Sequence, residues 1–216
     1  LRLTLREALQ LGIDQASLVH ALQNHDELTY ELVHFAARHR DDPYTLGGVD
    51  YTGAELAEHV REVMRDRLTG DAAPYNATFV QNGIACTTAS VIAASLGITD
   101  LESITDADAR RIANAHLLLC MYNAWQPGVF ALSGWDLTGA LPLDRAKVRG
   151  LISGGDTRWI ERGAYDLLGA EPDAKRSSSG MPTATALYGS LPDQLASQTS
   201  FASRLAGILK IRKRHG

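Results

Sequence analysis

The stretch that decides the fold is Ala16-Ser17-Leu18-Val19-His20-Ala21-Leu22-Gln23, followed directly by Asn24-His25-Asp26-Glu27-Leu28-Thr29. Its first half predicts a short buried strand over 17–23, and an amide, an imidazole and two carboxylates come right after it. Parallel α/β barrels present their catalytic groups where a strand ends in this way. The alternative is that Asn24-His25-Asp26 is only a turn and that Glu27 starts the next helix. We refer to residues 24–29 as the 24–29 block.

A second strand is predicted at 129–132, after a helix over 106–124 that Thr105 caps. The second half of this helix is apolar all round, which is typical of a helix buried between layers. Gln126-Pro127-Gly128 ends the helix. The order strand, helix, strand, helix indicates two βα units of a parallel α/β sheet. Two parallel strands cannot form a sheet that is buried on both faces, so further strands are expected in the insertions or outside this chain.

The rest of the chain is predicted to be helical with long loops. Thr52-Gly53-Ala54-Glu55 is a capping box, and the helix that it begins runs to about Thr69. Residues 30–51 are expected to start as a helix and to continue as a loop, and 71–85 are expected to be irregular. Further helices are predicted at 4–11, at 87–96 and from Ser200 to the basic cluster at 210–216, and the long segment 137–199 is expected to hold only short helices.

Composition describes an ordinary globular chain. The 216 residues are 45% hydrophobic and 21% charged, and the net charge is -4. This charge gives no reason to expect a nucleic acid as partner, and the basic residues at the end of the last helix suit the negative end of its dipole. No apolar run reaches the roughly 20 residues of a membrane span. We therefore expect neither nucleic acid nor a membrane as partner.

The termini and the cysteines bear on localisation. The sequence begins Leu1-Arg2-Leu3-Thr4, without a starting Met and without a signal peptide, so we expect a piece of a longer cytoplasmic chain. Cys86 and Cys120 lie in apolar helical contexts, and we expect both to be reduced and buried. Five histidines show no metal-ligand spacing, and we interpret them as structural or surface residues. They are His20, His34, His39, His59 and His116.

The 24–29 block resembles the last signature motif of the α-amylase superfamily of glycoside hydrolases, in which a strand ends in Asn-His-Asp. The longer form Asn-His-Asp-Glu-Leu-Thr is most similar to trehalose synthases, which interconvert maltose and trehalose. Residues 126–134, Gln-Pro-Gly-Val-Phe-Ala-Leu-Ser-Gly, resemble the eighth barrel strand of that superfamily. Residues 187–195, Leu-Tyr-Gly-Ser-Leu-Pro-Asp-Gln-Leu, are similar to one trehalose-synthase subgroup, and 200–213 resemble the last barrel helix.

The resemblance implies a helix-rich α/β fold, namely the C-terminal part of a (β/α)8 TIM barrel with strands seven and eight and their helices. Residues 1–216 would form one partial catalytic domain, with a helical insertion at about 30–104 and a long loop at about 134–199. The upstream strands that carry the nucleophile and the general acid are expected before Leu1. The fragment alone is therefore expected to be inactive. The resemblance implies no cofactor, and any structural Ca²⁺ would lie outside this segment.

The superfamily works by a retaining double displacement, in which two carboxylates about 5–5.5 Å apart make and break the glycosidic bond. The resemblance gives Asp26 the role of a third carboxylate, which stabilises the transition state. It gives His25 a hydrogen bond to a hydroxyl of the same glucose. Asn24 would support the strand end, and Glu27 is a candidate for the neighbouring subsite. The implied partners are a disaccharide, maltose or trehalose, and the remainder of the barrel.

Two further sets of side chains are candidates for sugar binding. Trp135 and Asp136 leave the second predicted strand at the same edge as the 24–29 block, so we expect them to line the cleft. The long loop carries a dense polar patch, in which an Arg–carboxylate pair could position hydroxyls and a Trp could stack on a pyranose. A structural, salt-bridged loop is the alternative for this patch, which consists of Asp156, Arg158, Trp159, Glu161 and Arg162.

Three other functions stay open. The chain could belong to an α-glucosidase, or to a sucrose-acting isomerase or another α-transglycosylase of the same superfamily. It could also be a non-catalytic helical binding module that only echoes a strand-end motif. Exchange of Asp26 for Asn separates the catalytic interpretations from the binding module, because only a catalytic carboxylate is needed for turnover.

Overall fold

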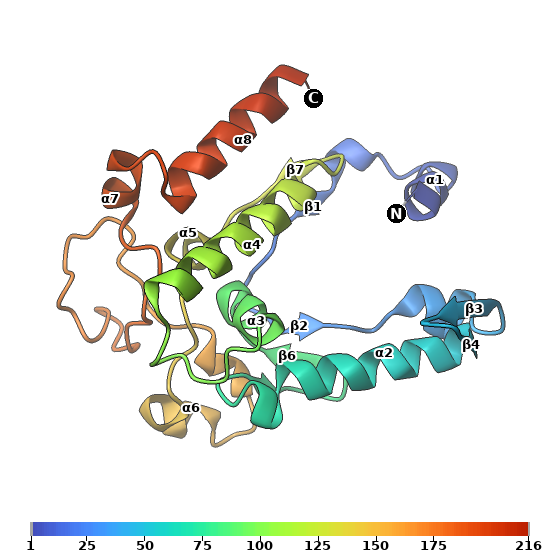
Figure 1. The fold of residues 1–216 in the computed structure, drawn as a ribbon, viewed down its shortest axis with the longest axis horizontal. Helices are drawn as coiled ribbons and strands as arrows, with labels where there is room; N and C mark the ends of the chain where they lie inside the picture. The colour runs from blue at the N-terminus through green and yellow to red at the C-terminus, as the bar shows by residue number, and fades with distance from the viewer. Residues whose placement is uncertain (1, 216) are drawn as a thin grey trace.

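The computed structural model describes residues 2–215, which form a helix-rich fold with small sheets (Figure 1). The α-helices in this range are α1 (Arg2–Gln10), α2 (Gly53–Leu68), α3 (Thr88–Ser95), α4 (Asp106–Ala124), α5 (Gly134–Thr138), α6 (Arg149–Ile152), α7 (Leu191–Ala196) and α8 (Phe201–His215). The strands are β1 (Val19–His20), β2 (Leu28–Thr29), β3 (Pro43–Leu46), β4 (Val49–Thr52), β5 (Ala77–Thr78), β6 (Gly83–Ala85) and β7 (Val129–Phe130). Short 3₁₀ turns are η1 (Gln15–Ser17), η3 (Gly70–Ala72), η4 (Arg145–Val148) and η5 (Thr157–Ile160), and η2 (His34–Arg38) is a π-helical turn.

Strands β1 and β7 form the parallel pair that the sequence predicts. Val19 lies opposite Val129, and the Val129 amide donates to the Leu18 carbonyl oxygen at 2.7 Å. Gly128 allows this approach, because its φ is +113° and an added Cβ would lie 2.3 Å from the Leu18 oxygen. The strands are shorter than the predicted 17–23 and 129–132. Pairing ends early because Ser133 already begins α5, whose capping box it forms with Asp136.

The last two residues of the 24–29 block, Leu28 and Thr29, form one strand of a small antiparallel sheet. Strand β2 pairs with β6, with Leu28 opposite Ile84, and β5 pairs with the other edge of β6. The prediction that residues 71–85 are irregular is therefore wrong, and so is the alternative that Glu27 starts a helix. The hairpin of β5 and β6 forms because the β6 residues Gly83, Ile84 and Ala85 are buried under neighbouring segments. The 24–29 block thus connects a parallel pair to an antiparallel sheet.

The predicted insertion at about 30–104 contains a second hairpin. Strands β3 and β4 pair across Gly47 and Gly48, which both have positive φ, where only a loop is expected from the sequence. Helix α2 then begins at the predicted capping box, in which Thr52 and Glu55 satisfy each other's amides. All the predicted long helices are confirmed to within two residues at each end.

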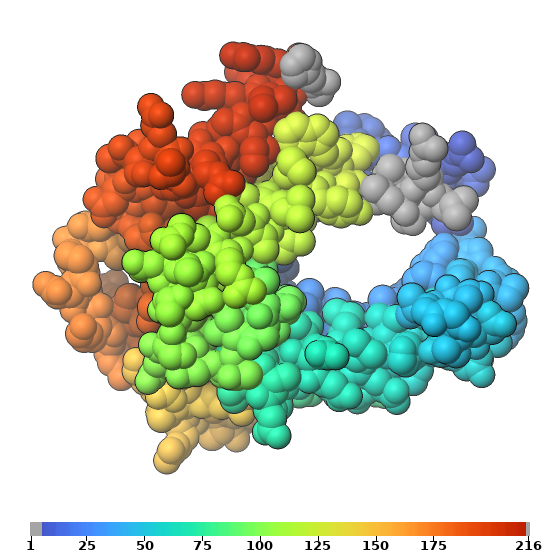
Figure 2. Space-filling view, viewed as in Figure 1, coloured from blue at the N-terminus to red at the C-terminus, as the bar shows by residue number. Residues whose placement is uncertain are grey.

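Helix α4 is packed on one side only within residues 2–215. Ile112, Leu117 and Cys120 are buried against α3 and α8, whereas Leu118 and Tyr122 are about 60% exposed. The expectation of a helix buried on all sides is therefore wrong for the described chain, because its other side has no cover. Figure 2 shows an open gap between the C-terminal half of α4 and helix α2. The three small sheets do not close into a barrel.

Candidate functional site

Residues 24–27 of the 24–29 block lie in the loop between the carboxyl end of β1 and strand β2. The Asn24 side-chain oxygen accepts a hydrogen bond from the Asp26 amide at 2.6 Å, which turns the chain between His20 and Leu28. This bond places the Asn24 side chain against the backbone of the turn. The side chain of His25 is 73% exposed and that of Asp26 is 47% exposed, and His25 Nε2 lies 3.5 Å from Asp26 Oδ2. Both groups are therefore accessible to a ligand.

The polar patch of the long loop contacts this block. We refer to it as the 156–162 segment. From turn η5, Arg158 Nη1 donates to Asp26 Oδ1 at 3.0 Å and to Glu27 Oε2 at 3.4 Å. Its Nε and Nη2 donate to the two oxygens of Asp156 at 2.8 and 3.1 Å, and its guanidinium lies 4.3 Å from the centre of the Phe79 ring. One arginine thus joins three carboxylates.

Arg162 adds a second link between the 156–162 segment and the block. Its Nε donates to the His25 carbonyl oxygen at 2.7 Å, and its Nη1 lies 3.5 Å from Asp156 Oδ2. Hydrogen bonds from Arg158 hold the pKa of the Asp156 carboxyl below its usual range, so Asp156 is a stable anion between the two guanidinium groups. The guanidinium of Arg162 also lies 5.2 Å from the centre of the Trp159 ring.

Glu161 lies on the inner side of the same segment and is 1% exposed. Its Oε2 accepts the Cys86 amide at 2.6 Å, and its Oε1 has no hydrogen-bond partner among the described residues. Burial raises the pKa of this carboxyl from 4.5 to about 8, so it is mostly protonated at neutral pH. A neutral Glu161 ties the 156–162 segment to the end of β6.

A cavity of about 280 Å³ lies beside the block. Its size is close to the lower end of the roughly 300–1,000 Å³ that ligand pockets occupy. Gln23 fixes one part of its wall, because its Oε1 accepts the Thr88 amide at 3.1 Å while its buried Nε2 has no partner among residues 2–215. Polar and apolar side chains share the lining, which consists of Leu22, Gln23, Asn24, Asp26, Glu27, Leu28, Thr29, Cys86, Thr88, Val91 and Leu119.

The structure does not bring Trp135 and Asp136 to this cavity. Asp136 is fully buried, and its Oδ1 accepts a hydrogen bond from Thr88 Oγ1 at 2.8 Å and lies 3.1 Å from His116 Nε2. Trp135 donates from its indole nitrogen to the Gly163 carbonyl oxygen at 2.8 Å. Both side chains therefore join parts of the fold: Asp136 joins α5 to α3 and α4, and Trp135 joins α5 to the segment after η5.

His116 is a structural residue, which is one of the two interpretations that the sequence allows, but its partners were not predicted. This residue is fully buried in α4, and its Nδ1 lies 3.0 Å from the Tyr188 hydroxyl while Nε2 faces Asp136. The signal was a single histidine in an otherwise apolar helix half, because a buried imidazole needs polar partners. Cys86 and Cys120 are free and buried, and burial raises the pKa of the Cys120 thiol to about 12.

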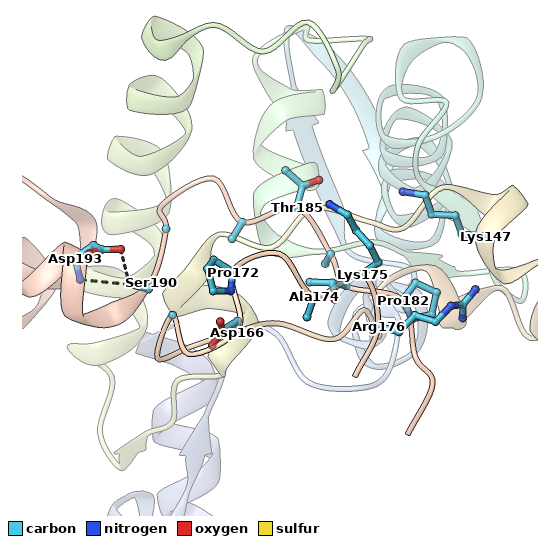
Figure 3. Close-up of a pocket in the computed structure, with 15 residues that line it drawn as sticks. Lys147, Asp166, Pro172, Ala174, Lys175, Arg176, Pro182, Thr185, Ser190 and Asp193 are labelled. Carbon is cyan, nitrogen blue, oxygen red and sulfur yellow. Dashed lines mark hydrogen bonds between the residues drawn. The ribbon is translucent and has the colours of Figure 1, made fainter. Parts of the chain in front are cut away.

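A larger cavity of about 850 Å³ lies within the long loop and is formed without any residue of the 24–29 block. Figure 3 shows Lys147, Lys175 and Arg176 towards one end of this cavity and Asp193 towards the other. Ser190 and Asp193 hydrogen-bond each other at the start of α7, so this carboxylate already has a partner. We assign no function to this cavity.

No protein-family model, no curated protein and no solved structure matches this chain. Among the helices within residues 2–215, none combines the length and the apolar character that a membrane crossing requires. Over the same residues, no three or more His, Cys, Asp or Glu side chains are grouped so that they could hold a metal ion.

Proposed function

We propose that this chain is part of the catalytic domain of a cytoplasmic, retaining α-glucoside enzyme that interconverts maltose and trehalose. The observation that carries the proposal is the position of Asp26. It follows a strand of a parallel pair, remains 47% exposed, and lines a cavity of about 280 Å³ that other polar side chains also line. The resemblance of the 24–29 block to trehalose synthases supports the same assignment.

In this proposal, Asp26 stabilises positive charge on the glucosyl ring during bond cleavage. Arg158 contacts Oδ1 of Asp26, which leaves Oδ2 for a sugar hydroxyl, and His25 Nε2 is 3.5 Å from that second oxygen. A hydroxyl can donate to the carboxylate and accept from the imidazole at the same time. The nucleophile and the general acid would come from strands outside this segment, and they would carry out the two displacement steps.

The uncovered surfaces of the chain support a place within a larger barrel. Strands β1 and β7 pair with each other, and neither has a second neighbour among the described strands. Large apolar side chains are exposed close to this pair, namely Val19, Leu118, Met121, Tyr122, Trp125 and Val129. Large exposed apolar patches are rare on monomeric soluble proteins, and where they occur they mark contact surfaces. We propose that the remaining barrel strands and helices cover them, so the isolated segment should lack activity.

The experiment is an assay of the complete protein that carries this chain, with maltose as substrate. Trehalose as the main product supports the isomerase, and mainly free glucose would favour an α-glucosidase. Exchange of Asp26 for Asn should lower kcat by about 100–1,000-fold, which is the usual effect of losing one transition-state stabiliser. Asp41, whose side chain is 90% exposed, provides the matched control as Asp41→Asn. If Asp26→Asn keeps its fold and its kcat stays within threefold of the wild-type value, the assignment is refuted.

A further inference from the structure

Contacts with residues outside the 24–29 block hold the Arg158 side chain in one orientation. Two of its nitrogens, Nε and Nη2, face the two oxygens of Asp156, and a bidentate pair of this kind fixes the plane of a guanidinium group. Phe79 packs against the face of the group. The remaining nitrogen, Nη1, therefore points in a fixed direction, and both Asp26 Oδ1 and Glu27 Oε2 lie within 3.4 Å of it.

The turn that carries Arg158 is anchored in the core. Ile160 of η5 is buried in a hydrophobic cluster, and Thr157 Oγ1 donates to the Thr78 carbonyl oxygen of β5 at 3.0 Å. Glu161 accepts the Cys86 amide at the end of β6. Because β6 also pairs with β2, the sheet that receives the 24–29 block and the turn that supplies Arg158 are parts of one packed unit.

The block needs such a support. Asp26 and Glu27 are adjacent in sequence, so their like charges repel each other unless a cation lies between them. Both residues lie outside the strand pairing, because β1 ends at His20 and β2 begins at Leu28. A loop carboxylate that can move by 1 Å loses much of its effect on a transition state.

We propose that Arg158 is a positioning residue for Asp26 and Glu27, and that Asp156 orients it for this task. This inference rests on the proposed function, because it assigns Arg158 a role in the turnover of an α-glucoside. Arg158 acts through the two carboxylates and leaves Asp26 Oδ2 open to the substrate. Its side chain therefore affects how well Asp26 is aligned in the transition state more than how tightly the ground-state sugar binds.

The test uses four single variants and one double variant of the complete protein, with maltose as substrate. Arg158→Met removes the charge and keeps an unbranched side chain, and Arg158→Lys restores the charge. Arg149 is exposed on α6, so Arg149→Met is the matched control. Asp156→Asn tests the orienting contact. We expect Arg158→Met to lower kcat by about 10–100-fold with KM within threefold, because misplacement of a catalytic group by about 1 Å has effects of this size.

Three further results are expected. Arg158→Lys recovers part of the lost kcat, and Arg149→Met leaves kcat unchanged. The double variant Arg158→Met with Asp156→Asn is no slower than Arg158→Met alone, because Asp156 acts through Arg158. A wild-type kcat in Arg158→Met overturns the inference. So does a loss that resides wholly in KM, or a double variant whose losses add.

A second readout separates the inference from the proposed function. If the wild-type protein turns over no α-glucoside, the proposed function is refuted. Amide hydrogen exchange in peptides that cover residues 24–29 then decides on positioning. Exchange that is at least tenfold faster in Arg158→Met than in Arg149→Met supports the positioning of the block. Equal exchange in the two variants overturns it.

Discussion

Glu161 makes the stability of the fold depend on pH. Its carboxyl is 1% exposed, its Oε2 accepts the Cys86 amide at 2.6 Å, and its pKa is raised from 4.5 to about 8 by burial. The change that tests this is Glu161→Gln. Glutamine keeps the shape and the acceptor oxygen for Cys86, but it has no proton to lose.

The direction of the change in stability with pH depends on whether the folded or the unfolded chain binds the Glu161 proton more tightly. Between pH 4.5 and 8 the unfolded chain has lost the Glu161 proton while the folded chain keeps it, so the free energy of unfolding falls as pH rises. The slope is about 1.4 kcal/mol per pH unit. The full contribution is present below pH 4.5, declines across this window by up to about 5 kcal/mol, and is constant above pH 8. Glu161→Gln abolishes this dependence.

Urea unfolding of the chain at half-unit steps from pH 5 to 9 measures the effect, with the fluorescence of Trp159 in the same turn as a local probe. The stability of Glu161→Gln relative to wild type should rise by about 1.4 kcal/mol per unit up to pH 8 and then stay level. Glu62, which is exposed on α2, provides the matched control as Glu62→Gln. If wild type and Glu161→Gln give parallel profiles between pH 5 and 8, the reasoning is refuted.

Two further predictions concern buried polar groups. Asp136→Ala should lower the free energy of unfolding by about 3–5 kcal/mol in urea titrations, because it leaves the buried His116 without its carboxylate partner; a loss below 1 kcal/mol would contradict this. Burial raises the pKa of the thiols of Cys86 and Cys120, so neither should react with a disulfide reagent at pH 8 until urea unfolds the chain. Rapid labelling of the native protein would show that one of them is reachable.

The helices were predictable because their start signals are local. Thr52 and Thr105 each form a capping box with a carboxylate three residues later, and the helices begin where these pairs predict. The strands of the antiparallel sheet were not predictable. They have two or three residues each, which is too short for an alternating pattern, and they form because β6 is buried between two neighbours.

Part of the candidate site could also be predicted. The exposure of His25 and Asp26 at a strand end follows from a local pattern, whereas their contact with the 156–162 segment depends on how η5 packs against β5 and β6. The charge density of this segment identified it as a candidate, but its partner could not be inferred. Asp136 was wrongly predicted to line the cleft. The predicted strand ends before this residue, and Asp136 becomes part of a helix cap.

The bond between Arg158 and Asp26 spans 132 positions of the chain. Closing a long flexible loop costs entropy that grows only with the logarithm of its length, so doubling the intervening chain would cost about 0.6 kcal/mol. The hairpin of β3 and β4 lies in this interval and contributes no residue to the cavity beside Asp26. Shortening or lengthening that hairpin should therefore leave the carboxylate cluster assembled, which makes the hairpin a suitable place to insert a reporter domain.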